Sequence, residues 1–291
     1  MFHSIVQKLL WMEKRSRPDL EVAVSFLTTR IQASTEEDWG KLRRTLNFVK
    51  ATQKDRRIIG SKDFLTMESW IDASHAIHMN MRGNTGGCIS LGVGVLHAKA
   101  SKQKLNSKSS TETEVIGVSE YVPYKIQLIN FIEGQGYHIK KKVLYQDNQS
   151  AMRMEKNGRN SCTGNSRHIS IRFFFVKDRV DKKEFTIEYC PTKSMLADYF
   201  TKPLQGSLFR DMRSIIMGWE PLEKLEAYGK TYLEPYPSKE RVGTYISGHG
   251  TNTIPTGERA TYAEVVKKNV SWNQPLTNVN IHSNNMRPSS H

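Results

Sequence analysis

The sequence has few cysteines and no long hydrophobic run, and both absences exclude classes of protein. The three cysteines, Cys88, Cys162 and Cys190, stand alone and form no Cys-x-x-Cys pair, which argues against a disulfide framework and a structural zinc site. No apolar stretch approaches the roughly 18 to 20 residues that span a bilayer. The N-terminus lacks the basic and apolar regions of a secretory signal. We therefore expect an intracellular, soluble protein.

Acidic residues are scarce relative to basic ones. The 291 residues include 43 Lys and Arg against 29 Asp and Glu, a formal net charge of +14. The surplus is confined to residues 1–219, which hold 35 basic and 22 acidic residues, whereas residues 220–291 hold 8 and 7. A basic surplus in the apolar-rich part indicates a folded domain that binds a polyanion. It favours nucleic acid over a membrane surface as that polyanion.

The order of periodic segments predicts a mixed α/β fold. Residues 1–61 show helical spacing, and short β-rich segments with glycine-rich connections follow from residue 62, including 64–71, 89–98 and an extension over 99–108. A long helix is expected over 111–133, where Pro123 should kink or split it. The elements expected after it are a strand at 143–145, helices at 148–157 and 167–181, a strand at 184–189, and helical pieces at 195–201 and 208–217.

Residues after Trp219 are rich in Pro, Gly, Thr, Asn and Ser, a composition typical of chain without a packed core. We therefore predict three parts: a helical part over 1–61, an α/β domain over 62–219, and a mostly disordered tail over 220–291.

Four acidic residues stand beside different expected core elements: Asp72, Glu114, Asp147 and Asp198. Phosphodiester hydrolysis at neutral pH requires metal ions, and Mg²⁺ prefers oxygen ligands. Each acid alone also fits a structural role, such as a capping box at Thr111-x-x-Glu114 or a helix N-cap at Asp147. Four acids on four separate elements together favour a metal site.

Five segments, three of which contain one of these acids, resemble those of one family. They are Arg17-Pro18-Asp19 with the helix from Trp39 to Lys50, Ser109-Ser110-Thr111-Glu112-Thr113-Glu114, Tyr145-Gln146-Asp147-Asn148-Gln149-Ser150-Ala151, Arg167-His168-Ile169-Ser170-Ile171-Arg172, and the run from Leu196 to Leu204. In this order, over about residues 10–218, they resemble the end of the reverse transcriptase and the ribonuclease H (RNase H) domain of copia-type (pseudovirus) retrotransposon polyproteins.

The resemblance implies an RNase H-like fold, a five-stranded mixed sheet flanked by helices. It also implies hydrolysis of the RNA strand of RNA/DNA hybrids with two Mg²⁺ ions, for which Mn²⁺ is a substitute. Carried onto this sequence, Asp72, Glu114 and Asp147 would be catalytic metal ligands, and Asp198 would complete the second metal site. Glu112 stays open as an alternative to Glu114.

Basic residues would then contact the phosphates of the hybrid without reading its sequence. The candidates are Lys99, Lys102, Lys104, Arg167, His168 and Arg172. A histidine near a nuclease site can also shuttle protons, but a phosphate contact or plain exposure is the favoured interpretation of His168. Each lysine also fits an ordinary solvated surface.

The sequence shows no Tyr-x-Asp-Asp polymerase motif and no integrase-type zinc cluster. We therefore expect the C-terminal part of a polyprotein without a polymerase site, located in the cytoplasm (in a virus-like particle) or in the nucleus. A reverse transcriptase polymerase domain is a candidate partner, and no membrane or small-molecule cofactor is expected. Two alternatives stay open: an inactive remnant that only binds nucleic acid or packs against a polymerase, and a transposase or integrase core, which the second position of the glutamate disfavours.

Overall fold

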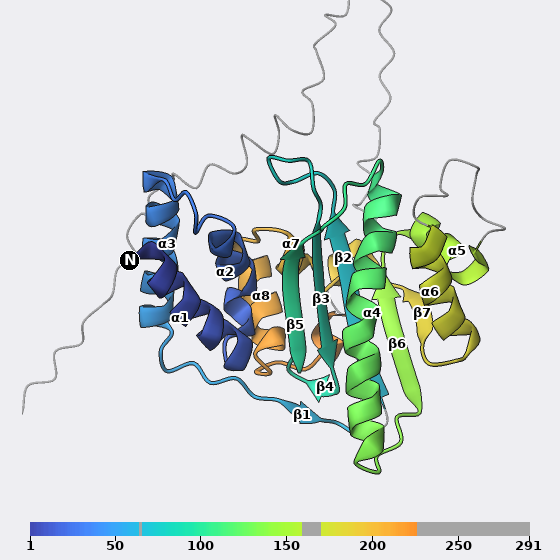
Figure 1. Ribbon diagram of the computed structural model, residues 1–291. Helices are drawn as coiled ribbons and strands as arrows, with labels where there is room; N and C mark the ends of the chain where they lie inside the picture. The colour runs from blue at the N-terminus through green and yellow to red at the C-terminus, as the bar shows by residue number, and fades with distance from the viewer. Residues whose placement is uncertain (64–65, 159–169, 226–291) are drawn as a thin grey trace, which may run out of the picture. The chain divides into compact units, whose positions relative to one another are not determined.

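Five strands form one mixed sheet in the order β5-β3-β2-β6-β7 (Figure 1). The computed structural model describes residues 1–63, 66–158 and 170–225. They belong to one compact unit, Met1–Pro237, whereas a second unit, Ser238–His291, lies outside the described residues. The strands are β2 (Thr66–Ser74), β3 (Asn84–Ser90), β5 (His97–Lys102), β6 (Lys141–Gln146) and β7 (Thr186–Tyr189).

The pairing of these strands confirms the predicted mixed α/β class. β2, β3 and β5 pair antiparallel, and then β6 joins β2 and β7 joins β6, both in parallel. A separate small ladder pairs β1 (Gly60–Ser61) with β4 (Gly92–Val93). Because β2 and β6 are parallel neighbours, their C-terminal ends lie at the same edge of the sheet.

Helices cover both faces of the sheet. Successive strand residues point to opposite faces, so Ile71 packs with the long helix α4 (Ser110–Gly134), whereas Trp70 packs with the segment around α7 (Asp198–Thr201) and α8 (Gly206–Ile216). α5 (Gln149–Asn157) and α6 (Ser170–Asp181) lie beside α4 (Figure 1).

The expected helical start is confirmed. α1 (Phe2–Arg15), a 3₁₀ turn η1 (Pro18–Leu20), α2 (Glu21–Thr28) and α3 (Glu36–Ala51) enclose a small apolar core of their own. α3 begins with a capping box between Thr35 and Asp38. The division into parts at residues 61 and 219 stays a prediction.

Helix α2 contacts the edge strand β5 through two hydrogen bonds. The backbone N–H of Ala100 donates to Glu21 Oε1 at 2.7 Å, and the hydroxyl of Ser25 donates to the Ala100 carbonyl at 2.9 Å. Both backbone groups of Ala100 point away from β3, so the helix takes the place of a further strand at this position.

The tight connection expected at Gly92 and Gly94 is confirmed, because these glycines adopt φ of +116° and +62° and turn the chain between β3 and β5. The connection expected at Gly86 and Gly87 is wrong, because both lie inside β3. Of the kink or split expected at Pro123, the split is wrong, because helix α4 continues through this residue. Pro123 is exposed, so water can bond the backbone carbonyl whose helical partner the proline removes.

The last described residues pack on the α7–α8 side of the sheet. Leu222 and Leu225 are buried, and the hydroxyl of Ser194 donates to the Leu225 carbonyl at 3.0 Å. The part of the predicted tail after residue 225 lies outside the described residues. Among those described, no helix is both long and apolar enough to cross a bilayer.

Candidate metal centre

Three carboxylates meet where β2 and β6 end. Asp72 lies in β2, Asp147 directly follows β6, and Glu114 lies near the start of α4. One carboxylate oxygen of each lies within 4.8 Å of those of the other two. The parallel pairing of β2 with β6 brings the two aspartates to one edge, and α4 crosses that edge with its first turns. Three segments far apart in sequence thus supply one oxygen-rich cluster, the three-acid cluster.

The electrostatics of the three-acid cluster are unfavourable without a counterion. Glu114 is 5% exposed and its Oε2 atom finds no hydrogen-bond partner among the described residues. Burial, together with the charges of Asp72 and Asp147, raises the pKa of Glu114 well above its usual range. Burial also raises the pKa of Asp147, and the charge of Asp72 adds to this, against a hydrogen bond from Thr192. Crowded carboxylates with an unsatisfied oxygen fit a hard divalent cation.

The fourth predicted acid, Asp198, stands apart from the three-acid cluster. Its Oδ1 atom accepts a hydrogen bond from Lys202 Nζ at 2.6 Å, and the same ammonium lies 3.9 Å from Asp72 Oδ2. Burial, followed by the charge of Asp72, raises the pKa of Asp198 to about 7. The structure therefore brings three of the four predicted ligands together and pairs the fourth with a lysine cation.

The alternative glutamate, Glu112, caps helix α4 instead. Its Oε2 atom accepts from the backbone N–H of Lys108 at 2.7 Å, and its own N–H donates to Ser109 Oγ at 3.2 Å. The N-cap of α5 is likewise Asn148, whose Oδ1 accepts from Ala151 N–H at 3.0 Å, and not Asp147. Neither Glu114 nor Asp147 is needed as a cap.

A glycine brings α7 close to the three-acid cluster. Gly86 lies opposite Asp72 in the β2–β3 ladder, and a Cβ atom on it would stand 2.5 Å from Thr201 Cγ2 and 2.9 Å from Phe200 Cβ. Because glycine lacks that atom, α7 lies directly on β3 and the Thr201 hydroxyl donates to Asp72 Oδ2. On the other side, Thr192 donates to Asp147 Oδ2 at 2.9 Å.

Sequence reasoning did not single out Thr192, Thr201 or Lys202. Thr201 and Lys202 belong to the segment from Leu196 to Leu204 that the resemblance used, and Lys202 stands four residues after Asp198, a spacing that pairs charges on a helix. Thr192 lies after β7 with no motif around it.

Two plant retrotransposon polyproteins are among the proteins to which the chain is similar in sequence. The chain is 26% identical over 216 residues, 74% of its length, to the retrovirus-related Pol polyprotein from transposon TNT 1-94 of Nicotiana tabacum. It is 27% identical over 200 residues, 67% of its length, to the Pol polyprotein from transposon RE2 of Arabidopsis thaliana. The chain is homologous to retrovirus-related Pol polyproteins.

The match covers a small part of these relatives, since the chain spans 16% and 14% of their lengths. No protein-family model matches the chain. Among solved structures, LC11-RNase H1, isolated from compost, is similar with a TM-score of 0.36 and 11% identity, over 47% of this chain and 92% of that one.

The residues predicted to contact nucleic acid differ in their partners and in their exposure. Lys99 donates to the Tyr124 hydroxyl at 2.6 Å and lies 4.3 Å above the Tyr124 ring centroid. Arg172 lies 3.9 Å from Glu120. Lys102 is partly buried at the end of β5, and Lys104 is exposed just beyond it. Arg167 and His168 lie outside the described residues, and a role of these six residues in nucleic-acid binding stays a prediction.

Behind the three-acid cluster lies a second buried carboxyl group, on Glu155 of α5. Its side chain is fully buried, and neither its two oxygens nor the two amide atoms of Gln146 find a hydrogen-bond partner among the described residues. Burial raises the pKa of Glu155 well above its usual range, while the nearby Gln146 amide and Lys156 oppose the shift. The charge of Glu155 also raises the pKa of Glu114. A charged Glu155 would therefore disturb both the core and the cluster.

Glu155→Gln is expected to become increasingly more stable than the wild type as the pH rises from acidic to neutral. A carboxyl whose folded pKa is raised stabilises the protein fully below its unfolded pKa, and that stability is lost as the pH rises towards the folded pKa. The unfolding free energy of the wild type should therefore fall relative to that of the variant by about 1.4 kcal/mol per pH unit from about pH 4.5 upward. Urea unfolding at pH 5, 6, 7 and 8 measures this.

The matched control for this series is Glu188→Gln, since Glu188 is exposed on β7. Its unfolding free energy should run parallel to that of the wild type across the same pH range. If the unfolding free energy of Glu155→Gln also ran parallel to that of the wild type, the prediction would be wrong, and Glu155 would be solvated or paired in the folded state.

Proposed function

We propose that this chain is a metal-dependent RNase H of a retrotransposon polyprotein that hydrolyses the RNA strand of RNA/DNA hybrids. The observation that carries the proposal is the convergence of Asp72, Glu114 and Asp147, whose oxygens lie within 4.8 Å of one another. Homology to Pol polyproteins supports a retrotransposon context, and a net charge of +14 suits a polyanionic substrate.

Asp72, Glu114 and Asp147 would hold the divalent ions, Mg²⁺ or Mn²⁺, with Asp198 at the border of the site. Bound there, metal ions supply a water-derived nucleophile and neutralise charge on the phosphodiester, and two ions can assist both the attacking and the leaving oxygen. The hydroxyls of Thr201 and Thr192 each donate to one oxygen of an aspartate and so orient it.

Lys202 balances the charge of the two aspartates that face it. Its ammonium lies 2.6 Å from Asp198 Oδ1 and 3.9 Å from Asp72 Oδ2, and these two charges raise the pKa of Lys202 against the effect of its partial burial. The lysine therefore stays charged beside the site and would attract the phosphate backbone of a substrate.

The test is cleavage of labelled RNA by the purified full chain. RNA annealed to DNA, the same RNA alone, double-stranded RNA and double-stranded DNA are each incubated with Mg²⁺, with Mn²⁺ and with EDTA. We expect products only from the RNA of the hybrid, only when a divalent ion is present. The absence of products under every metal condition would contradict the proposal.

The same experiment separates the alternatives. Binding of the hybrid without metal-dependent cleavage would support the inactive remnant, and joining of DNA ends would support a transposase or integrase core. The same proposal includes a location in the cytoplasm (in a virus-like particle) or in the nucleus. It also includes a reverse transcriptase polymerase domain as a partner, and both parts rest on the polyprotein context alone.

A further inference from the structure

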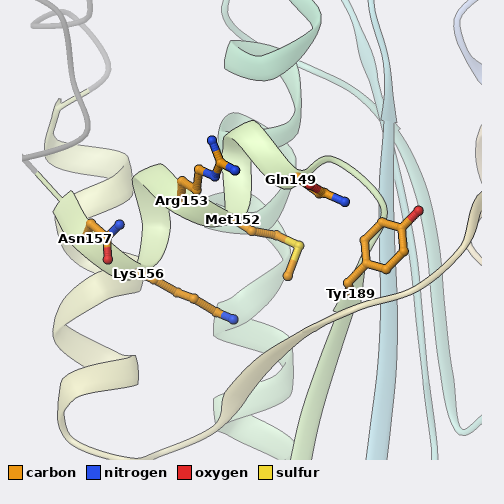
Figure 2. Close-up of a pocket in the computed structure, with 6 residues that line it drawn as sticks. All are labelled: Gln149, Met152, Arg153, Lys156, Asn157 and Tyr189. Atoms are coloured by element: carbon orange, nitrogen blue, oxygen red, sulfur yellow. The ribbon is translucent and has the colours of Figure 1, made fainter.

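A groove runs beside the three-acid cluster, between α5 and the end of β7. It has a volume of about 250 Å³ and is lined by Gln149, Met152, Arg153, Lys156, Asn157 and Tyr189. The five α5 residues follow the i, i+3, i+4, i+7, i+8 spacing of one helix face, so the groove extends along that helix. Figure 2 shows Tyr189 on the strand opposite that helix. We call this feature the α5–β7 groove.

The chemistry of the α5–β7 groove suits a nucleic-acid strand. Its floor includes the buried thioether side chain of Met152, and its wall includes the ring of Tyr189, which is 50% exposed. Arg153 and Lys156 are exposed on α5 and supply two positive charges. None of the described residues that line the groove is acidic. Cations beside an accessible aromatic ring are the combination that binds a sugar-phosphate backbone and its bases without sequence preference.

Both walls of the α5–β7 groove lead to Asp147. On one side, α5 begins two residues after Asp147. On the other, Tyr189 lies opposite Gln146 in the β6–β7 ladder, and Thr192, three residues further on, donates to Asp147. A strand whose phosphodiester lies at the three-acid cluster can therefore continue into the groove without leaving the surface.

We propose that the α5–β7 groove binds two to three nucleotides of one strand next to the phosphodiester at the three-acid cluster. The inference rests on the proposed function for the identity of the substrate. From Gln149 to Lys156 the helix rises about 10 Å, a length that two to three nucleotides of a strand can span. Arg153 and Lys156 contact phosphates, and the ring of Tyr189 packs on a sugar or base.

The test measures binding of an RNA/DNA hybrid by fluorescence anisotropy in EDTA, so that no cleavage is needed. The groove variant is Arg153→Gln with Lys156→Gln. Its control is Lys8→Gln with Arg15→Gln, which removes the same charge from exposed positions of α1. We expect the slope of log affinity against log salt to fall by about two for the groove variant and to stay near that of the wild type for the control, since each lost phosphate contact lowers it by about one.

Tyr189 is tested separately, with a variant that keeps the ring. Tyr189→Ala should weaken binding about five- to tenfold, whereas Tyr189→Phe should bind within about twofold of the wild type, if ring packing is the contribution. Circular dichroism and Tm confirm that each variant is folded. Equal loss in Ala and Phe would overturn the packing role of the ring, and equal affinity and salt slope in the groove and control variants would overturn the groove itself.

The outcomes for groove and function are distinguishable. If the wild type cleaves hybrids but the groove variants bind and cleave like the control, the groove inference fails and the proposed function stands. If the groove variants lose affinity while no protein cleaves, the groove stands as a nucleic-acid site and the proposed function fails.

Discussion

Asp147→Asn is expected to lower the rate of hybrid cleavage by about 100-fold or more, which corresponds to about 2.7 kcal/mol or more of lost transition-state stabilisation. The amide has the shape of the carboxylate but no charge, and it is a weaker ligand for a hard cation. Asp147 is one of only three described carboxylates that converge, so the loss removes a third of the anionic ligand set.

The folded state itself should survive this change. Burial and then the charge of Asp72 raise the pKa of Asp147, against the hydrogen bond from Thr192 and the charge of Lys202, so the neutral amide removes a charge that the folded state disfavours. We expect the Tm without metal to be equal to or above that of the wild type. Mg²⁺ should raise the Tm of the wild type more than that of the variant, because a ligand that binds only the folded state stabilises it according to its affinity.

The matched control for Asp147→Asn is Asp181→Asn, which removes an aspartate charge from the exposed end of α6. It should cleave hybrids at the wild-type rate and respond to Mg²⁺ like the wild type. Undiminished cleavage by Asp147→Asn, with an unchanged response of its Tm to Mg²⁺, would remove Asp147 from the candidate metal centre.

Lys125→Met is expected to remove a strong pH dependence of stability. Lys125 is completely buried between α4 and the sheet, where its Nζ donates to Ser69 Oγ at 2.9 Å and to the Val143 carbonyl at 2.7 Å. Burial lowers its pKa from 10.5 to about 7. Between these two pH values the unfolded chain binds a proton that the folded protein does not, so stability rises with pH.

The size of this effect follows from the shift. Relative to Lys125→Met, the wild type should gain about 1.4 kcal/mol of unfolding free energy per pH unit between about pH 7 and pH 10, and nothing below pH 6. Urea unfolding at pH 6, 7, 8 and 9 measures the difference, with Lys8→Met as the exposed control. A constant difference between wild type and variant across this range would show that Lys125 keeps its proton in the folded state.

Much of the fold could be predicted from the sequence because the local signals agree. Helical spacing, capping residues and β-rich segments place nearly all the elements within a few residues of where they lie. The failures come from tertiary contacts. Gly86 and Gly87 resemble turn residues but lie inside β3, where a Cβ would meet Phe200 on one face and the Tyr121 ring on the other.

The candidate metal centre could be predicted only in part. Asp72 and Asp147 follow from the ends of their strands, but local patterns do not tell which strands are neighbours. The family resemblance supplied that expectation, and the parallel pairing of β2 with β6 is what joins the two aspartates. The spacing of Asp198 and Lys202, four residues apart, is a local signal for their ion pair, and a role of Asp198 as a metal ligand stays a prediction. The burial of Lys125 did leave a signal, since it stands at helical spacing between the buried Val122 and Ile129.

The contact between α2 and β5 has a consequence for solubility. The outer side of an edge strand offers unpaired backbone groups that can recruit a strand from another molecule and start aggregation. Glu21 and Ser25 occupy both groups of Ala100 on that side. A shortened chain that begins at residue 62 would keep the whole three-acid cluster but expose this edge, so we expect the N-terminal helices to protect the sheet from self-association.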